Sequence, residues 1–236
     1  MKKIAFITDV HLGEQFPIEN NVDPKENFEK VLADISKRGI NELIFGGDIG
    51  DASAHDFFFE SVKPFTVDFI IGNHDKFNEV KKHLNKEINV EELYYTKEDN
   101  DYKYIFLDTS SEEISKAQLE WLEVEIISTK KIVFFIHHPI IKIETPVDQL
   151  YPLKNRDELK SILIKSKKEC SVFCGHYHMN DETKFKNINQ TITQSLSFQI
   201  VKNAEEIEID NSNFGYRILV FHNDRIETEI IRFEIP

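Results

Sequence analysis

Six short segments of this chain are predicted to be strands, and five of them end directly in a cluster of polar residues. The segments are 3–8, 42–45, 67–71, 102–107, 131–136 and 171–174. They are rich in Ile, Val and Phe, and their apolar residues are too continuous for half-exposed strands, so we predict strands that are buried on both faces. Strands of this kind belong to sheets that helices cover.

Helix start signals lie between the predicted strands. Asp23 can cap a helix in which Pro24 takes the first position and Glu26 completes a capping box. Similar signals at Ser115 and Asn155 begin two further helices. Each of the three segments carries an apolar stripe, which predicts that one face of each helix packs on a core.

The last part of the chain is rich in strand-like runs. These are 191–201, 215–221 and 225–233, and the last two are joined by His222-Asn223-Asp224, which is typical of a hairpin. Alternating strands and helices followed by late strands predict an α/β fold, α+β in its tail, with helices outside the sheets. The length suits one large domain, so we expect a single domain over residues 1–236.

Polar residues gather directly after five of the predicted strands. In open α/β sheets, ligands bind beyond the carboxyl ends of strands, so clusters that are distant in sequence converge there if their strands share a sheet. Glycine suits such sharp exits because it lets the backbone turn abruptly or come close to an ion. The clusters are Asp9-Val10-His11, Gly47-Asp48-Ile49-Gly50-Asp51, Gly72-Asn73-His74-Asp75, His137-His138 and Gly175-His176-Tyr177-His178.

The candidate ligands in these clusters are carboxylates, an amide oxygen and imidazoles, and none is a thiolate. They are Asp9, His11, Asp48, Asn73, His137, His176 and His178. Such a set suits Mn, Fe, Zn or Co better than it suits a structural zinc cage. Seven ligands exceed what one ion with an open position needs, whereas two ions that share a bridging carboxylate use them all. The set therefore predicts two metal ions at a catalytic centre.

In chain order, the motifs D-x-H, G-D-x-x-D, G-N-H-D, H-H-P and G-H-x-H resemble those of the calcineurin-like metallophosphoesterase superfamily. Within it, the chain is most similar to the bacterial class III cyclic-nucleotide phosphodiesterases, which act on 3′,5′-cAMP. This likeness lies in Leu107-Asp108-Thr109, Gln118-Leu119-Glu120-Trp121-Leu122, Leu153-Lys154-Asn155-Arg156 and Gly215-Tyr216-Arg217. The resemblance implies a four-layer α/β/β/α sandwich with two mixed β-sheets flanked by helices, and a dinuclear site at the carboxyl ends of the strands.

The resemblance also implies a role for each candidate site residue. Asp9, His11 and His178 would bind the first metal ion, Asn73, His137 and His176 would bind the second, and Asp48 would bridge them. His74 would be the general acid. Asp51 would orient His74 and raise its basicity, which favours the imidazolium form near neutral pH.

We therefore expect a phosphodiesterase for a small phosphodiester, with a cyclic nucleotide such as 3′,5′-cAMP or 2′,3′-cAMP first. A hydroxide that bridges the ions would attack phosphorus in line, and His74 would protonate the departing oxygen. The alternatives are a pyrophosphatase for ADP-ribose or a CDP-alcohol, a phosphomonoesterase or protein phosphatase, and a non-catalytic scaffold. Ala52 stands where the superfamily's protein phosphatases have Arg, which disfavours that activity. The complete ligand set disfavours a scaffold, because buried carboxylates and imidazoles are costly without a metal or partner.

The charge and the apolar content limit the partners. A formal net charge of −13 argues against DNA or RNA, whose binding relies on Lys and Arg, whereas bound cations still allow a small phosphorylated substrate, for which we expect a nucleotide. No apolar run could span a bilayer, and the apolar stretch 4–7 is too short for a signal peptide, so we expect no membrane partner and a cytoplasmic location. Cys170 and Cys174 suit a buried strand better than a disulfide framework. A homodimer stays open.

Other residues near the motifs have supporting roles in this interpretation. We expect Asp75 to brace the turn after His74, while Asp108 and His138 either support a ligand or are structural. Phe57-Phe58-Phe59 could stack on a base, but core packing is the favoured interpretation. Three histidines lie in polar surroundings and are expected at the surface: His55, His83 and His222.

Overall fold

The computed structural model describes residues 2–84 and 91–235. Its helices are α1 (Gln15–Glu19), α2 (Pro24–Lys37), α3 (His55–Val62), α4 (Phe77–Val80), α5 (Lys116–Glu125), α6 (Pro146–Leu150) and α7 (Arg156–Ser166), with the 3-10 turns η1 (Ala52–Ala54) and η2 (Lys81–His83). Its strands are β1 (Lys2–Ile7), β2 (Glu42–Gly46), β3 (Thr66–Ile70), β4 (Tyr95–Glu98), β5 (Tyr102–Leu107), β6 (Lys131–Ile136), β7 (Cys170–Cys174), β8 (Asp181–Phe185), β9 (Ile188–Ile192), β10 (Gln199–Ile200), β11 (Ile209–Asp210), β12 (Asn213–Phe221) and β13 (Ile226–Glu234).

The first sheet contains the earliest strands of the chain together with the latest ones. Its order is β13-β12-β1-β2-β3. The strands β1, β2 and β3 run parallel to one another, while β12 pairs antiparallel with β1 and β13 with β12. Parallel strands bring their carboxyl ends to the same edge, so the loops after β1, β2 and β3 leave this sheet side by side.

The second sheet holds the strands from the middle of the chain, in the order β4-β5-β6-β7-β9-β8. Strands β5, β6, β7 and β9 are parallel, and the edge strands β4 and β8 are antiparallel to their neighbours. The six strands predicted from sequence are therefore divided between two sheets. Convergence of the polar clusters was expected if their strands shared one sheet, and this condition is wrong. The clusters converge because the carboxyl ends of the two sheets meet.

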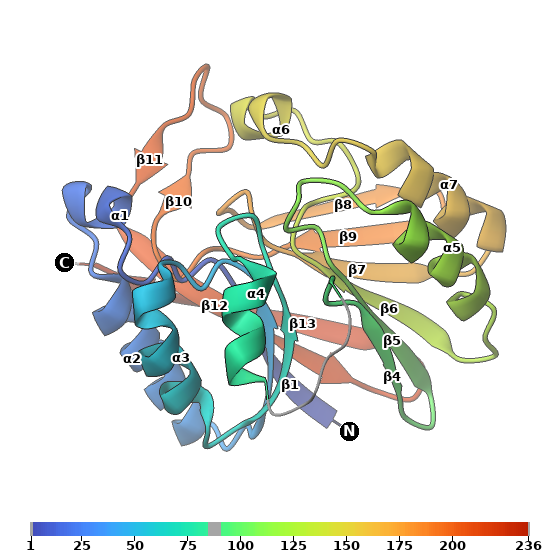
Figure 1. Cartoon of the computed structure of the whole chain (residues 1–236), viewed down its shortest axis with the longest axis horizontal. Coiled ribbons are helices and arrows are strands. Elements are labelled where there is room, and N and C mark those ends of the chain that lie inside the picture. The colour runs from blue at the N-terminus through green and yellow to red at the C-terminus, as the bar shows by residue number, and fades with distance from the viewer. Residues whose placement is uncertain (1, 85–90, 236) are drawn as a thin grey trace.

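Three apolar clusters build the layers between these sheets and the helices. Helices α2 and α3 cover the first sheet, and α5 and α7 cover the second (Figure 1). Between the sheets lies a largely aromatic cluster in which the ring of Phe6 is 5.7 Å from that of Phe135, which stacks on Phe173. Two mixed sheets flanked by helices confirm the predicted four-layer α/β/β/α sandwich.

Two of the three predicted helix caps form as expected. Asp23 accepts a hydrogen bond from the Glu26 amide at 3.0 Å, and Ser115 accepts one from the Gln118 amide at 3.2 Å. Asn155 precedes α7 but makes no side-chain cap bond. Its amide side chain instead bonds both the N–H and the carbonyl of Ile114, because it serves to tie two loops together.

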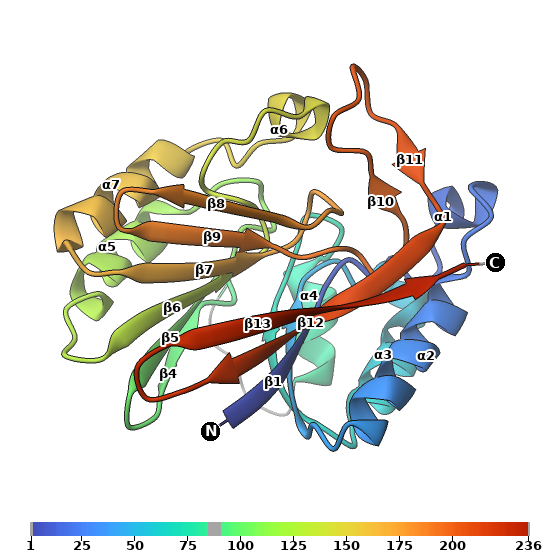
Figure 2. The same cartoon turned by 180° about the vertical axis from the view of Figure 1, so that it is seen from behind.

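The segment 191–201 differs from the single strand predicted there. Strand β9 ends at Ile192, and the chain then crosses towards the first sheet before the two residues of β10. In this crossing, Ser195 donates a hydrogen bond to the carbonyl of Asp9 at 2.8 Å. The segment is buried and forms single backbone hydrogen bonds with β7 and β12, in which Thr193 N–H donates to Cys174 O at 2.8 Å and Ser195 O accepts the Gly215 amide at 3.1 Å. These isolated bonds do not make it part of a strand ladder. Residues 199–210 then form the small β10–β11 hairpin, which lies beside α6 at one end of the molecule (Figure 2).

Strand β7 carries both cysteines, as its first and last residues, and both are buried. Burial raises the pKa of the Cys170 thiol to about 12, which keeps it protonated and unreactive. Across residues 2–84 and 91–235, no helix combines the length and the apolarity that crossing a bilayer requires.

Candidate metal centre

The loops after β1, β2, β3, β6 and β7 meet where the carboxyl ends of the two sheets face each other. Most of the candidate ligands there have a left-handed backbone, at a cost of roughly 1–2 kcal/mol for an ordinary residue. Such conformations persist only where the surrounding structure holds them, and they concentrate at functional sites. These residues are Asp9 (φ 57°), His11 (φ 54°), Asp48 (φ 61°), His176 (φ 67°) and His178 (φ 47°).

One group of donors consists of Asp9, His11 and His178. His11 Nε2 lies 3.1 Å from His178 Nε2, which in turn lies 3.2 Å from Asp9 Oδ1. Two ligand atoms at right angles around an ion, each roughly 2.1 Å from it, lie roughly 3 Å apart. The three side chains are buried and could hold one metal ion.

A second group consists of Asp48, His137 and His176, which could hold another ion. His137 Nε2 lies 3.1 Å from Asp48 Oδ2, and the same oxygen lies 3.8 Å from His11 Nε2 in the first group. Asp48 therefore stands between the two groups. Its other oxygen, Oδ1, accepts the backbone N–H of His74 at 2.9 Å.

The four imidazoles of the two groups are held by hydrogen bonds on their outer nitrogens. A carbonyl or carboxylate oxygen can only accept, so each imidazole donates from the outer nitrogen and presents the other one to the centre. The bonds are His137 Nδ1 to Gly46 O (2.8 Å), His178 Nδ1 to Phe198 O (2.9 Å), His176 Nε2 to Tyr151 O (2.9 Å) and His11 Nδ1 to Glu14 Oε2 (3.0 Å).

The protonation of these residues follows from burial and from the carboxylates. Burial, helped by the neighbouring His137, lowers the pKa of His176 to about 4, so this imidazole is neutral. Burial also opposes charge on His137, but Asp48 outweighs it and raises the pKa to about 9. Burial opposes charge on Asp9, yet His178 holds its pKa at about 2. The carboxylates are thus ionised, and a metal cation would take the place of the His137 proton.

Asn73 supplies an observation that tests whether this donor set fits a metal. Its Oδ1 is buried and has no hydrogen-bond partner within the described part of the chain. Buried polar atoms are rarely left unpaired. An ion in the second group would provide the missing partner, and the mixture of O and N donors suits Mn, Fe or Zn. The residues present therefore fit a two-metal centre.

Asp75 fixes the two turns that carry Asp48 and Asn73. Its carboxylate accepts backbone N–H groups from Asp48 at 2.8 Å and from Ile49 and Gly72 at 2.9 Å, which confirms the expectation that it braces the turn. Gly72 allows this close packing, because a Cβ there would lie 2.1 Å from Asp48 Oδ1. Burial and the nearby Asp48 raise the pKa of Asp75 to about 7, in opposition to its three N–H donors.

His74 lies at the edge of the centre and pairs with the carboxylate of Glu14, in the loop that precedes α1. His74 Nδ1 lies 3.0 Å from Glu14 Oε1, while Glu14 Oε2 takes the His11 bond. The bond to Glu14 raises the pKa of His74 to about 9. Burial opposes charge on Glu14, but its bonds to His11 and His74 hold its pKa at about 2. The carboxylate of Glu14 therefore favours the protonated form of His74.

The structure differs from the sequence-based expectation about the partner of His74. Asp51 is exposed, precedes η1 and lies beside Gly13, and no hydrogen bond joins it to His74 among the described residues. Glu14 takes that place, because the loop after His11 folds back over the site. The only sequence signal for Glu14 is its position three residues after His11, which the motifs do not specify.

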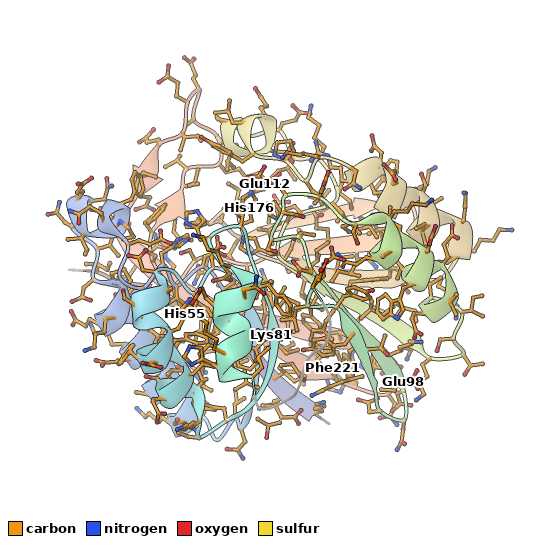
Figure 3. The ribbon with its side chains drawn as sticks, in the orientation of Figure 1. His55, Lys81, Glu98, Glu112, His176 and Phe221 are labelled. Carbon is orange, nitrogen blue, oxygen red and sulfur yellow. The ribbon has the colours of Figure 1, made fainter. Side chains whose placement is uncertain are left out.

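These side chains open into a pocket of about 490 Å³, a volume typical of small-molecule sites. Glu112 and His176, both labelled in Figure 3, line this pocket. One end is lined by metal-ligand candidates and the other by apolar side chains. The lining residues are His11, Glu14, Phe16, Asp48, Asn73, His74, Glu112, His138, Val147, Tyr151, His176, His178, Phe198, Ile200, Ile207 and Ile209.

The remaining residues near the motifs are structural or lie at the margin of the site. Buried His138 lines the pocket, with Nδ1 2.9 Å from the Thr109 hydroxyl, and burial holds its pKa well below the usual range. Asp108 accepts the Leu93 amide at 2.7 Å, and its oxygens contact no candidate ligand in the described residues. Residues 57–59 do not line the pocket, and Phe58 is fully buried in the core of the first sheet.

The expectation that His55 lies at the surface is wrong. It is the first residue of α3, where Figure 3 labels it, and it is buried. Its ring lies 6.4 Å from that of Phe59 and 5.8 Å from that of His83. Packing against these two rings buries His55, which its polar neighbours in sequence do not reveal. His83 and His222 are half-buried.

Comparison with known proteins agrees with this geometry. The family model described as calcineurin-like phosphoesterase matches residues 2–190. A relative from Fibrobacter succinogenes, named "Probable cyclic nucleotide phosphodiesterase", is 26% identical and covers 99% of this chain and 95% of its own. A relative from Arcobacter nitrofigilis, named "Probable glycerophosphodiester phosphodiesterase GpdQ", is 29% identical over 77% of this chain and 67% of its own.

A solved structure shows the same fold over the full length. It is a dimetal phosphatase from Danio rerio, with a TM-score of 0.66 and 11% identity, covering 99% of this chain and 98% of that one. The family match spans well over half of the chain and includes all of the residues gathered at the centre. The chain therefore belongs to the calcineurin-like phosphoesterases and is a metal-dependent hydrolase of phosphoric esters.

Proposed function

We propose that the chain is a two-metal phosphodiesterase that hydrolyses a small phosphodiester, with a cyclic nucleotide of the cAMP type as the first candidate. The observation that carries this proposal is the position of Asp48 between two groups of donors, 3.1 Å from His137 Nε2 and 3.8 Å from His11 Nε2. A shared carboxylate at this place suits a pair of ions. Asp9, His11 and His178 would hold one ion, Asn73, His137 and His176 the other, and Asp48 would bridge them.

The chemistry divides between the ions and the side chains. Bound ions of this kind lower the pKa of water, polarise the phosphoryl oxygens and orient the ester, and Mn, Fe and Zn can all do so. The outer hydrogen bonds of the imidazoles keep the ligand atoms aimed at the centre. His74, which points into the same pocket, is placed to give a proton to the departing oxygen.

The proposal keeps His74 as the acid and changes the residue that orients it. Asp51 was the expected partner, but Glu14 lies within hydrogen-bond distance of His74 Nδ1. A carboxylate at Nδ1 fixes the ring and favours the protonated form. Glu14 is therefore the positioning residue in this proposal, and Asp51 has no direct part.

Support for a diester comes from the relatives. One is named for cyclic nucleotides and another for glycerophosphodiesters, and both names refer to phosphodiesters. A glycerophosphodiester is accordingly the second candidate substrate. The cytoplasmic location, the nucleotide nature of the substrate and the single domain remain predictions, and the homodimer stays open.

The test is a substrate panel on Mn²⁺-loaded protein. We expect the highest kcat/KM for 3′,5′-cAMP or 2′,3′-cAMP, lower values for a glycerophosphodiester and ADP-ribose, and the lowest for a phosphoserine peptide. Asn73→Ala, which removes a candidate ligand, serves as the inactive control. A preference for ADP-ribose would replace the diester with a pyrophosphate substrate. Hydrolysis of the peptide alone would contradict the proposal.

The acid role of His74 has its own expected result. The variant His74→Ala should slow esters with poor leaving groups by about 100-fold or more and p-nitrophenyl esters far less, because only a poor leaving group needs a proton. Rates on alkyl and nitrophenyl diesters measure this difference. Equal losses on both would show that His74 does not act as the acid.

A further inference from the structure

We propose that the apolar end of the pocket binds a flat, uncharged organic group of the substrate, such as a nucleobase, and that Phe16 on α1 is its main specificity residue. This inference rests on the proposed function, because it takes the phosphate to lie at the metal end of the same pocket. It adds the residues that determine which ester binds.

The two ends of the pocket differ in chemistry. Away from the metal-ligand candidates, the wall consists of aromatic and aliphatic side chains from four separate segments. These are Phe16 from α1, Val147 and Tyr151 from α6 and the residue after it, Phe198 from the crossing segment, and Ile200, Ile207 and Ile209 from the β10–β11 hairpin. An apolar wall continuous with a metal centre fits the organic part of an ester whose phosphate binds the ions.

A row of rings leads from the metal end to the mouth. The ring of Phe198 lies 4.5 Å from that of His178, and the ring of Phe16 lies 5.2 Å from Phe198 with an edge-to-face angle of 63°. Such pairs leave ring faces available for stacking by a third ring. A base that enters beside Phe198 would therefore meet Phe16 next.

The exposed apolar residues of the molecule support this placement. Phe16 is 49% exposed and Tyr151 is 57% exposed, and both line the pocket. Large apolar side chains that remain exposed around a hollow commonly mark a binding site. Figures 1 and 2 both place α1 and α6 on either side of the β10–β11 hairpin, so the hairpin closes the wall between them.

The charges at the apolar end limit what can bind there. Among the described residues that line the pocket, none is Lys or Arg. Glu112, an acidic residue that lines the pocket, pairs with Lys154 at 2.9 Å. A second phosphate or a carboxylate on the substrate would meet no Lys or Arg among these lining residues, and Lys154 beside them already pairs with Glu112. The site therefore suits an ester with one phosphate and an uncharged substituent.

The experiment compares ligands that share a phosphate and differ in the base. Titration calorimetry on Mn²⁺-loaded protein would measure Kd for AMP, ribose 5-phosphate and ADP. We expect AMP to bind about tenfold more tightly than ribose 5-phosphate, because stacking of one base on an aromatic residue has about this effect. ADP should bind no more tightly than AMP.

The variants separate Phe16 from its surroundings. Phe16→Ala should weaken AMP about tenfold and leave ribose 5-phosphate unchanged. Phe16→Tyr should keep the preference. Ile207→Ala tests the part of the wall formed by the β10–β11 hairpin and should weaken AMP alone. The matched control is Ile18→Ala, because Ile18 lies on the same short helix, is 55% exposed and does not line this pocket.

Each outcome bears on the inference. Equal Kd values for AMP and ribose 5-phosphate, no measurable binding of AMP, or an equal loss for both ligands in Phe16→Ala would overturn it. Much tighter binding of ADP would also overturn it, because it would reveal a cationic subsite. If AMP bound more tightly than ribose 5-phosphate but no diester were hydrolysed, the apolar subsite would be supported and the proposed function would be contradicted.

Discussion

The two carboxylate oxygens of Glu14 serve two different imidazoles. Oε2 orients His11, a candidate metal ligand, and Oε1 orients His74, the proposed acid. The two rings lie 4.7 Å apart at nearly a right angle. One side chain therefore couples the position of an ion to the position of the acid. Loss of either carboxylate oxygen of Glu14 would affect both.

Replacing Glu14 with Gln is the sharpest residue-level test of this arrangement. Gln has one oxygen and one NH₂ group, so only one of the two imidazoles keeps its acceptor. We expect kcat for a diester with a poor leaving group to fall roughly 10- to 100-fold, the usual effect of losing an outer partner of a metal ligand. The matched control is Asp51→Asn, which should change kcat less than about twofold.

Steady-state kinetics with alkyl and nitrophenyl diesters would measure both variants, and Glu14→Asp should recover part of the loss. If Asp51→Asn were the more damaging change, the orienting role would return to Asp51. If Glu14→Gln lowered both diesters equally without changing metal content, Glu14 would be structural only.

Sequence patterns predict single residues well where chemistry leaves few choices. The seven candidate ligands come directly after strands and lie together in the structure. Glu14, Phe16 and Phe198 lie outside the motifs, because a carboxylate or an aromatic ring can reach the site from many positions in a loop. Their contribution depends on the path of the backbone, which no local pattern specifies.

At the level of elements, the turns after β2 and β3 are held together by one buried carboxylate. Asp75 accepts three backbone N–H groups from these turns. Its replacement by Ala would leave three buried donors without partners. We expect Asp75→Ala to lower the free energy of unfolding by at least about 3 kcal/mol, since each unpaired buried donor costs about 1–3 kcal/mol.

Urea unfolding of Asp75→Ala beside Asp56→Ala would check this expectation. Asp56 lies on α3 with a side chain that is 94% exposed, so its removal should change stability by less than about 0.5 kcal/mol. A loss below about 1 kcal/mol for Asp75→Ala would mean that water enters and satisfies the turns.

Prediction of the elements was most accurate for strands that consist of continuous apolar runs. The interior strands β1, β2, β5, β6, β7 and β12 lie within two residues of their predicted bounds, because continuous apolar runs identify them. The interior strand β9 does not, because it spans Ile188–Ile192 where the prediction was 191–201. Strand β8 has mostly polar residues and lies at a sheet edge, so the pattern does not show it. Residues 193–198 were predicted to continue a strand, but they cross between the sheets and are buried without joining a strand ladder.

At the level of the whole molecule, the centre joins the two sheets. Each donor group draws on both: His178 follows β7 of the second sheet and meets Asp9 of the first, and His137 of the second meets Asp48 of the first. The sequence alone could not assign strands to sheets, because periodicity shows burial and not neighbours. The four-layer arrangement was expected from the family resemblance.

Metal binding should therefore stabilise the whole chain. We expect Mn²⁺ to raise Tm in a single transition and chelation to reverse it, since a ligand at 100 times its Kd adds about 2.7 kcal/mol to the native state. Calorimetric unfolding would measure this, with His178→Ala as a variant that responds weakly. Two separate transitions would contradict our proposal of a single domain over residues 1–236.

The joining of the sheets has a consequence for the order of events when the protein is made. Both donor groups need a residue from the loop after β7, either His176 or His178, although their other members lie as early as Asp9. A growing chain thus has neither ion site until the loop after β7 has left the ribosome. Loading with metal is in this sense a late step of biosynthesis, and an ion that arrives early finds only separate donors.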